Sequence, residues 1–139
     1  MGKLGNEVIQ NMKEIVDNCM GDSSPACQSA CPMDTDVKGY VNLIGEGKGE
    51  EAISLIREKL FLPKTLGRIC AHPCEEGCRR GDEDSPISVA NLKRYAADNF
   101  DNPANWDLAK AASTGKKVAI IGAGPAGAQA AIDLAKDGH

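Results

Sequence analysis

The most informative stretch of this sequence is Gly67-Arg-Ile-Cys70-Ala-His72-Pro-Cys74-Glu-Glu-Gly-Cys78-Arg-Arg80. Its cysteines recur at every fourth residue, and a second group, Cys19, Cys27 and Cys31, lies upstream. Soft metals are held by thiolates brought together from separate segments, and a bound cluster can fasten a small helical domain that has little core of its own. The two cysteine groups therefore predict an iron-sulfur domain that is mainly α-helical.

The spacing within the second group indicates more than one cluster. On a continuous helix Cys70 and Cys78 would lie about 12 Å apart along the axis, which is too far for one compact four-iron cluster. Either the chain bends at Pro73 or the cysteines serve two clusters. The upstream Cys27-x3-Cys31-Pro repeats the end of the bacterial ferredoxin motif, in which the last cysteine ligates the other cluster. We therefore expect two sets of ligands, Cys27 with Cys78, and Cys31 with Cys70 and Cys74.

Two clusters with four ligands each need more side chains than the 6 cysteines of this chain. Other side chains that could ligate, in or beside the two groups, are Asp22, His72, Glu75 and Glu76. Cysteine with histidine is also a zinc set, but these spacings are not the C-x2-C pairs of structural zinc, so iron-sulfur is favoured over a zinc-stabilised interaction module. A metal-free helical module that docks on a partner is the remaining alternative.

Composition narrows the classes of function. The chain has 139 residues, a net charge of -4 and 4% aromatic residues, so it offers neither a positive field nor stacking surfaces for nucleic acid. It has no apolar run of membrane-spanning length and no signal peptide, so we expect a cytoplasmic protein whose thiols stay reduced. With 2 histidines and no Ser-His-Asp or Cys-His arrangement, no catalytic residue is predicted.

Hydrophobic periodicity predicts the helices around the cysteines. The expected helices cover residues 4–16, 37–44, 50–60 and 86–100, with breaks at both cysteine groups and the first group on an irregular loop. We expect Asp34 and Thr35 to cap the second helix and Ser85-Pro86 to begin the fourth. Residues 1–110 form the predicted helical domain, which ends in a connector, residues 106–115, with a short helical piece.

The C-terminal residues have a different character. Residues 117–121 form a short β-branched run that predicts a strand, and Gly122-x-Gly124-x-x-Gly127 follows it and opens an Ala-rich helix that extends to Lys136. This pattern is typical of the first β-α unit of a Rossmann domain, in which the glycines let a dinucleotide pyrophosphate approach the helix N-terminus. We expect residues 111–139 to be the start of such a domain in a longer reductase, and the chain alone to bind flavin poorly and to have no turnover.

The ordered series of motifs resembles that of one protein family. The segments that carry the resemblance are Cys27-Gln-Ser-Ala-Cys31-Pro32, Asp36-Val-Lys-Gly-Tyr40, residues 67–80, Pro86-Ile-Ser-Val-Ala-Asn-Leu-Lys-Arg-Tyr95 and the glycine turn. They are similar to the small (β) subunit of NADPH-dependent glutamate synthase and to the N-terminal part of dihydropyrimidine dehydrogenase. The resemblance covers nearly the whole chain.

This resemblance implies a dicluster, α-helical ferredoxin-like domain with four-iron (4Fe-4S) clusters, followed by domains that bind FAD and NADPH. It implies that electrons pass between NAD(P)H, flavin and clusters and then to a partner redox subunit or domain, so that the chain is part of a larger oxidoreductase. Carried over by position, one cluster would take Cys19, Cys27 and Cys78, and the other Cys31, Cys70 and Cys74.

At two places the sequence departs from the family pattern. The second cysteine of the family's first group is replaced by Asp22, whose carboxylate ligates iron more weakly than a thiolate. The family's Glu or Gln ligand in the helix after Pro86 is replaced by Lys93, and an ammonium cannot ligate. We therefore expect at least one cluster, with a second that is three-iron, water-ligated or absent.

Overall fold

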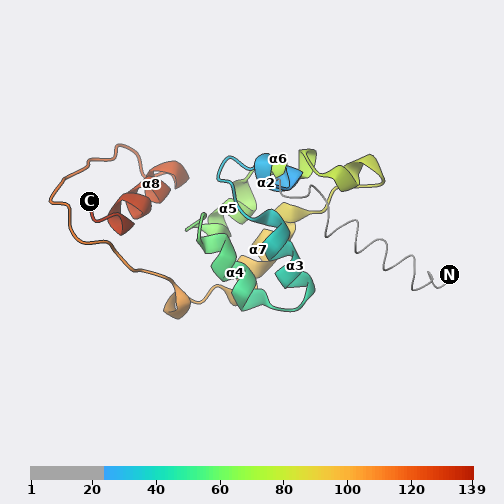
Figure 1. Ribbon diagram of the computed structural model, residues 1–139, viewed down its shortest axis with the longest axis horizontal. Helices are drawn as coiled ribbons and strands as arrows, with labels where there is room; N and C mark the ends of the chain where they lie inside the picture. The colour runs from blue at the N-terminus through green and yellow to red at the C-terminus, as the bar shows by residue number, and fades with distance from the viewer. Residues whose placement is uncertain (1–23) are drawn as a thin grey trace.

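The computed structural model describes residues 24–139, and within that range the chain is helical and has no strand (Figure 1). In chain order the α-helices are α2 (Ala26–Ser29), α3 (Val37–Gly45), α4 (Gly49–Arg57), α5 (Pro63–Ile69), α6 (Pro73–Glu76), α7 (Val89–Phe100) and α8 (Pro125–Lys136). Two 3-10 helices, η1 (Arg79–Asp82) and η2 (Pro103–Asn105), flank α7. The mainly helical class predicted from the sequence is confirmed for this range, and the helix expected at residues 4–16 lies outside it.

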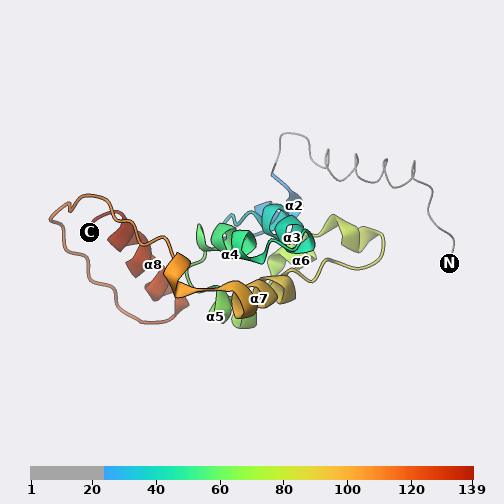
Figure 2. The same ribbon diagram turned by 90° about the horizontal axis from the view of Figure 1, so that it is seen from below.

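The body of the molecule consists of α3, α4, α5 and α7, which lie side by side in both views (Figures 1 and 2). α4 packs against both α3 and α7, and α5 packs along α7. Each longer helix turns one apolar stripe inward, as its period requires. The buried apolar side chains are Val37 and Tyr40 on α3, Ala52, Ile53 and Ile56 on α4, Leu60 between α4 and α5, Cys74 on α6, and Val89, Ala96 and Ala97 on α7.

The start of α3 differs from the expectation in its capping residue. Asp36, and not Asp34 or Thr35, is the N-cap, and its Oδ1 accepts a hydrogen bond of 2.8 Å from the Gly39 backbone N–H. Asp34 has a left-handed backbone with φ 48° and instead accepts from the Gln28 side chain. Its carboxylate is therefore engaged elsewhere and does not reach the first turn of the helix.

The start of α7 also differs, because the helix begins at Val89 rather than at Ser85-Pro86. A carboxylate from another helix serves its first turn: Glu75 Oε1 on α6 accepts a hydrogen bond of 2.8 Å from the Ala90 N–H. Negative charge is favourable at a helix N-terminus, where the backbone N–H groups lack partners. This tertiary contact lies outside the local sequence pattern that suggested the earlier start.

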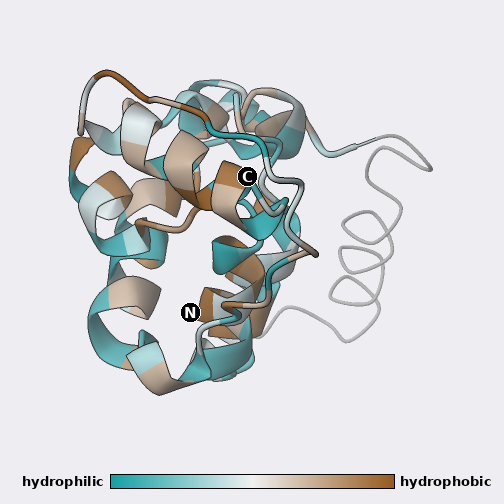
Figure 3. Cartoon of the chain, turned by 90° about the vertical axis from the view of Figure 1, so that its left-hand side faces the viewer, coloured by the Kyte–Doolittle hydropathy of each residue, from teal (hydrophilic) through white to brown (hydrophobic). Residues whose placement is uncertain are grey.

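The strand expected at residues 117–121 is absent from the described chain, where this segment is extended but unpaired. Its side chains are exposed, with Val118 at 54%, Ile120 at 38% and Ile121 at 102%. The hydrophobic stretch of the loop before α8 is visible on the outside of the molecule (Figure 3). A strand exists only when a neighbour pairs with its backbone groups, and residues 24–139 supply none. The short helix expected within residues 106–115 is also absent, since the helical turn in this region is η2, just before it.

A buried ion pair joins α4 to the segment that leaves α7. Arg57 Nε and Nη2 donate to the two carboxylate oxygens of Asp101 at 2.8 and 2.7 Å. Trp106 Nε1 donates to the same carboxylate at 2.9 Å, and the Arg57 guanidinium lies 4.0 Å from the centroid of the Trp106 ring. The edge of this ring contacts Phe61, with centroids 5.2 Å apart. The cluster Arg57, Phe61, Asp101 and Trp106 therefore anchors the beginning of the C-terminal segment.

The helix α8 lies at the far end of the molecule from α2 and α6 (Figures 1 and 2). It buries no residue. A hydrogen bond of 2.9 Å from the Phe61 N–H to Gln129 Oε1 joins it to the helical body, and Lys136 Nζ lies 3.7 Å from the Asp107 carboxylate. No helix of residues 24–139 combines the length and the apolar character needed to span a bilayer.

Candidate metal centre

The downstream cysteines lie where the chain turns between short helices. Cys70 is the C-cap of α5 and has an extended backbone, Cys74 lies in α6, and Cys78 precedes η1. Between the first two, His72 has a left-handed backbone with φ 48°, and Pro73 begins α6. The chain therefore bends before Cys74, as one of the two sequence interpretations required, and the cysteines are not spread along one helix.

The upstream cysteines reach the downstream ones through the packing of α2 against α6. Cys27 lies in α2, rather than on the irregular loop that was expected, and Cys31 follows shortly after its end. The two short helices approach closely because Gly77 has no side chain: a Cβ added there would lie 3.1 Å from the Ala30 Cβ and 3.5 Å from the Ala26 carbonyl oxygen. Segments separated by more than forty residues in the sequence therefore meet at the cysteines.

Electrostatic interactions connect particular cysteines among the described thiols. Cys74 is influenced by the charges of Cys31 and Cys70, and Cys27 by that of Cys78. All of these cysteines are free thiols. Cys19 and Asp22, the other predicted ligands of the upstream group, lie outside the described residues. Of the six predicted ligands, five are therefore described, and their division into two ligand sets stays a prediction.

Within residues 24–139, no three side chains of His, Cys, Asp or Glu are gathered as the ligands of a single metal ion would be. A cluster of several irons and sulfides separates its thiolate ligands farther than one ion does, because each thiolate binds a different iron.

Burial sets the protonation of the thiols in the ligand-free protein. Burial first, and then the neighbouring Cys70 and Cys31, raise the pKa of the Cys74 thiol to about 11, against an opposing effect of Lys93. Burial likewise raises the pKa of Cys27. Thiolates are the form that binds metal, so a bound cation must displace these protons, and the free energy of binding then depends on pH.

Cys31 is the exception among these thiols. Burial on its own would raise its pKa, but hydrogen bonds with Thr35 and with the Met33 backbone outweigh this effect, and the pKa is lowered. Cys31 Sγ and Thr35 Oγ1 share a hydrogen bond of 3.4 Å, and Thr35 is 1% exposed. At Cys70, the His72 backbone N–H donates to the sulfur at 3.3 Å. Hydrogen bonds to sulfur are among the interactions that tune thiolate-held clusters.

Two residues at this site had no metal-binding role in the sequence interpretation. Tyr40 of α3, expected only as an apolar packing residue, is 2% exposed, and burial raises its pKa. The thiols that add to this effect belong to both sets, namely Cys74, Cys31, Cys27 and Cys70. Lys93 of α7 is 6% exposed and interacts electrostatically with Cys31 and Cys74. Nothing in the helical period distinguishes Tyr40 from the other core residues around it.

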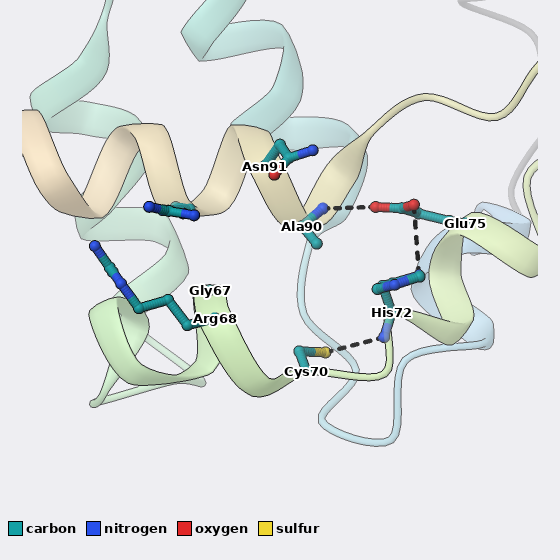
Figure 4. A pocket seen from close by; sticks show the side chains of 8 residues that line it. Gly67, Arg68, Cys70, His72, Glu75, Ala90 and Asn91 are labelled. Atoms are coloured by element: carbon teal, nitrogen blue, oxygen red, sulfur yellow. Dashed lines mark hydrogen bonds and ion pairs between the residues drawn. The ribbon is translucent and has the colours of Figure 1, made fainter.

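The candidate ligands His72 and Glu75 have other contacts in the structure (Figure 4). Glu75 accepts from the Ala90 N–H and lies 3.4 Å from His72 Nδ1, so its carboxylate links α6 to α7. Both residues line a surface pocket of about 270 Å³ together with Cys70, Arg68, Asn91 and Arg94. The pocket therefore opens directly beside one of the clustered thiols.

The arginines beside the cysteines are engaged with carboxylates. Arg68 Nη2 donates to both oxygens of Asp98 at 3.0 and 2.9 Å, and Arg80 Nη2 lies 3.2 Å from Asp84. These pairs are exposed to solvent. Their charge is balanced locally, which distinguishes both arginines from Lys93.

The glycine turn has the geometry that its pattern predicts. Gly122 has a φ of 106°, which favours glycine, and Gly124 is the N-cap of α8. A Cβ at Gly127 would collide with the Gly122 carbonyl oxygen. Gly122 and Gly127 therefore have steric reasons to be glycine, a left-handed turn and a close backbone approach, whereas a Cβ at Gly124 would meet no atom within 4 Å.

With this geometry established, comparison with known proteins identifies the family. Residues 6–105 match the family described as dihydropyrimidine dehydrogenase domain II, 4Fe-4S cluster. The chain belongs to this family. The match covers the helices from α2 to α7 and both cysteine groups, and it confirms the resemblance drawn from the sequence motifs.

Individual relatives agree with the family assignment. The NADP(+)-dependent formate dehydrogenase subunit beta of Moorella thermoacetica is 40% identical, over 81% of this chain and 19% of that protein. The NADPH-Fe(3+) oxidoreductase subunit beta of Geobacter sulfurreducens is 39% identical, over 81% of this chain and 17% of the relative. The glutamate synthase [NADPH] small chain of Escherichia coli is 36% identical, over 91% and 27%. The chain thus spans between about a sixth and just over a quarter of the length of these relatives.

The residues of the centre fit the 4Fe-4S cluster of the family description. The donors are thiols, the ligands that iron-sulfur clusters take, and they come from two segments that converge. Cys74 is buried and its neighbours are partly buried, so a cluster there would be shielded from bulk water. Cys31, Cys70 and Cys74 would hold one cluster, and Cys27 and Cys78 would contribute to the other.

Proposed function

We propose that this chain is the electron-transfer module of a larger NAD(P)H-dependent oxidoreductase that uses flavin. Its helical part, residues 1–110, holds iron-sulfur clusters that relay electrons between a flavin and a partner redox subunit or domain. The single observation that carries the proposal is the packing of α2 against α6, which brings the upstream and downstream cysteines together. The relatives whose names include NADP or NADPH support the choice of nicotinamide cofactor.

The proposed ligands of one cluster are Cys31, Cys70 and Cys74, and those of the other are Cys19, Cys27 and Cys78. When bound, such clusters accept and release single electrons. The chain's own part is to position the thiolates and exclude water. Thr35 and the His72 N–H hold two of the sulfurs, and Tyr40 fills the space beside both sets. No side chain acts as an acid or base in this scheme.

Residues 111–139 are, in the same proposal, the first β-α unit of the FAD-binding Rossmann domain. The steric requirements at Gly122 and Gly127 support it, and so does Gly124 as the N-cap of α8 directly after the turn. The exposed β-branched residues of 117–121 are then the first strand, which pairs only when the remaining strands of the sheet are present. On this account the chain alone has no turnover with NAD(P)H.

Anaerobic reconstitution of the chain with ferrous iron and sulfide tests the proposal. We expect a brown protein whose visible absorbance is bleached by dithionite, with an electron paramagnetic resonance signal in the reduced state. A colourless protein that takes up one zinc per chain, or one that takes up no metal, contradicts it.

Matched cysteine variants test the two ligand sets separately. Cys74→Ser should remove the iron and sulfide of one cluster, and Cys78→Ser those of the other, since each serine deprives a different cluster of a thiolate. If either variant binds as much iron as the parent chain, the assignment of that ligand is wrong.

A further inference from the structure

Lys93 is a buried cation within the helical core. It is 6% exposed and lies on the inward stripe of α7 with Val89, Ala96 and Ala97. The other residues of this stripe are apolar and pack against α3 and α4. A charged side chain in such a place is costly unless an opposite charge accompanies it.

The charge that accompanies Lys93 does not come from a carboxylate of the described chain. None of the ion pairs found in residues 24–139 involves Lys93. Cys74 of α6 belongs to the same buried core as Val89, Ala96 and Ala97 of the α7 stripe that carries Lys93. α6 is also bonded to the first turn of α7 through Glu75 and the Ala90 N–H, and the electrostatic partners of Lys93 include the thiols of Cys31 and Cys74. A thiolate-held cluster at this place would supply the opposite charge that Lys93 lacks among the ion pairs of residues 24–139.

We propose that Lys93 is the counter-charge of the cluster held by Cys31, Cys70 and Cys74, and that it raises the reduction potential of this cluster relative to the other. The inference rests on the proposed function, because it requires the cluster to be there. Thiolates make the site anionic, and reduction adds one more negative charge. A fixed positive charge nearby favours the reduced state, since potentials of such clusters depend on the net charge around them. The ammonium acts through space and takes no ligand position.

The surroundings of the second set differ. Cys27 is influenced by the charges of Cys78 and Asp36, and no cation is among the influences on its pKa. Each set therefore has a carboxylate nearby, Glu75 for Cys74 and Asp36 for Cys27, but only the set of Cys31 and Cys74 has a buried positive charge beside it. A difference of this sign makes the Cys31 cluster the better electron acceptor of the two.

A redox titration followed by electron paramagnetic resonance tests the inference on the reconstituted 139-residue chain. Lys93→Met keeps the length of the side chain and removes its charge, and Lys93→Arg keeps the charge. We expect Lys93→Met to lower the reduction potential of the cluster held by Cys31, Cys70 and Cys74. At a fixed potential, the ratio of its reduced to its oxidised form should fall at least tenfold, which corresponds to about 59 mV for one electron. Lys93→Arg and the surface control Lys59→Met should leave both potentials unchanged. Equal potentials in the parent chain and Lys93→Met contradict the inference.

Thermal unfolding with and without the cluster supplies a readout that a packing role would not give. Lys93→Met should raise the melting temperature of the metal-free chain, because an uncompensated buried charge is removed, and lower that of the loaded chain. A shift of the same sign in both states contradicts the inference. If the parent chain takes up no iron or sulfide, the proposed function itself is wrong, whereas a loaded chain with unmoved potentials overturns only the role of Lys93.

Discussion

The helical region that carries the cysteines and the segment that follows it contain similar apolar residues but use them differently. In residues 24–106 the apolar side chains of three helices meet and form a core. In residues 107–139 none is buried, although the segment includes Val118, Ile120 and Ile121. The difference teaches that apolar content does not by itself make a core. The helical region finds its partners within the chain, whereas no strand in residues 24–139 pairs with the extended residues 117–121.

The largest effect should come from the same truncation made in each region. Ile56 is fully buried on α4 and Ile121 is fully exposed. We expect Ile56→Ala to reduce the free energy of unfolding by about 4 kcal/mol, through lost burial and the cavity left behind. Ile121→Ala should change it by less than about 0.5 kcal/mol. Urea unfolding followed by circular dichroism measures both, and equal effects would mean that the two regions are not held in different ways.

The next largest effect tests the anchor between the regions. Asp101→Ala leaves Arg57 buried without its partner, since the side chains of this pair are 5% and 11% exposed. We expect a loss of roughly 3 kcal/mol in the free energy of unfolding. Asp98→Ala is the matched control, because it removes the exposed partner of Arg68, and it should hardly change the melting temperature. Comparable losses in the two variants would refute a special role for the buried pair.

A smaller effect is expected at the contact that joins the two cysteine groups. In Gly77→Ala the new Cβ would press on Ala30 and separate α6 from α2, which costs about 2 kcal/mol by overpacking. Iron bound through Cys27 and Cys78 should fall as well. Gly45→Ala, which places its Cβ in open space at the end of α3, should keep the parent iron content. An unchanged iron content in Gly77→Ala would show that this close approach is not needed for the site.

The smallest expected effect concerns the stability of the chain at acidic pH. Burial opposes ionisation of Asp101, but hydrogen bonds from Arg57 and Trp106 outweigh it and hold the pKa of this carboxyl below its ordinary value of 3.8. A carboxylate with a lowered folded-state pKa contributes stability that is complete above the unfolded-state pKa and is lost as the pH falls through the folded-state one. Urea midpoints of the parent chain should therefore fall more steeply than those of Asp101→Asn between about pH 5 and about pH 2.5. Parallel curves would mean that Asp101 does not titrate in this range.

The helices were predictable from the sequence because they depend on short-range spacing. The apolar period located α3, α4 and α7, and the glycine pattern with its Ala-rich continuation located α8. The division of the thiols into two ligand sets stays a prediction. What failed depends on contacts between distant segments. The start of α7 is determined by Glu75 of another helix, and the missing strand by the absence of a neighbour in the described chain.

Lys93 shows the limit of the same reasoning at the site. The sequence alone shows that Lys93 cannot be a ligand, because its side chain ends in an ammonium group. Only the fold shows that this side chain is buried near Cys31 and Cys74. A long, flexible side chain can leave a helix in several directions, so its partner is a tertiary property.

The contacts of Trp106 with Arg57 and Asp101 have a consequence for electron transfer. They fix the position at which the chain leaves the helical region. If residues 107–116 behave as a flexible linker, their end lies at an r.m.s. distance of about 17 Å from that point. Under the proposed function, a flavin domain tethered so closely would meet the helical module at effective concentrations in the millimolar range. The rate of their exchange would then be independent of dilution, as in an intramolecular reaction.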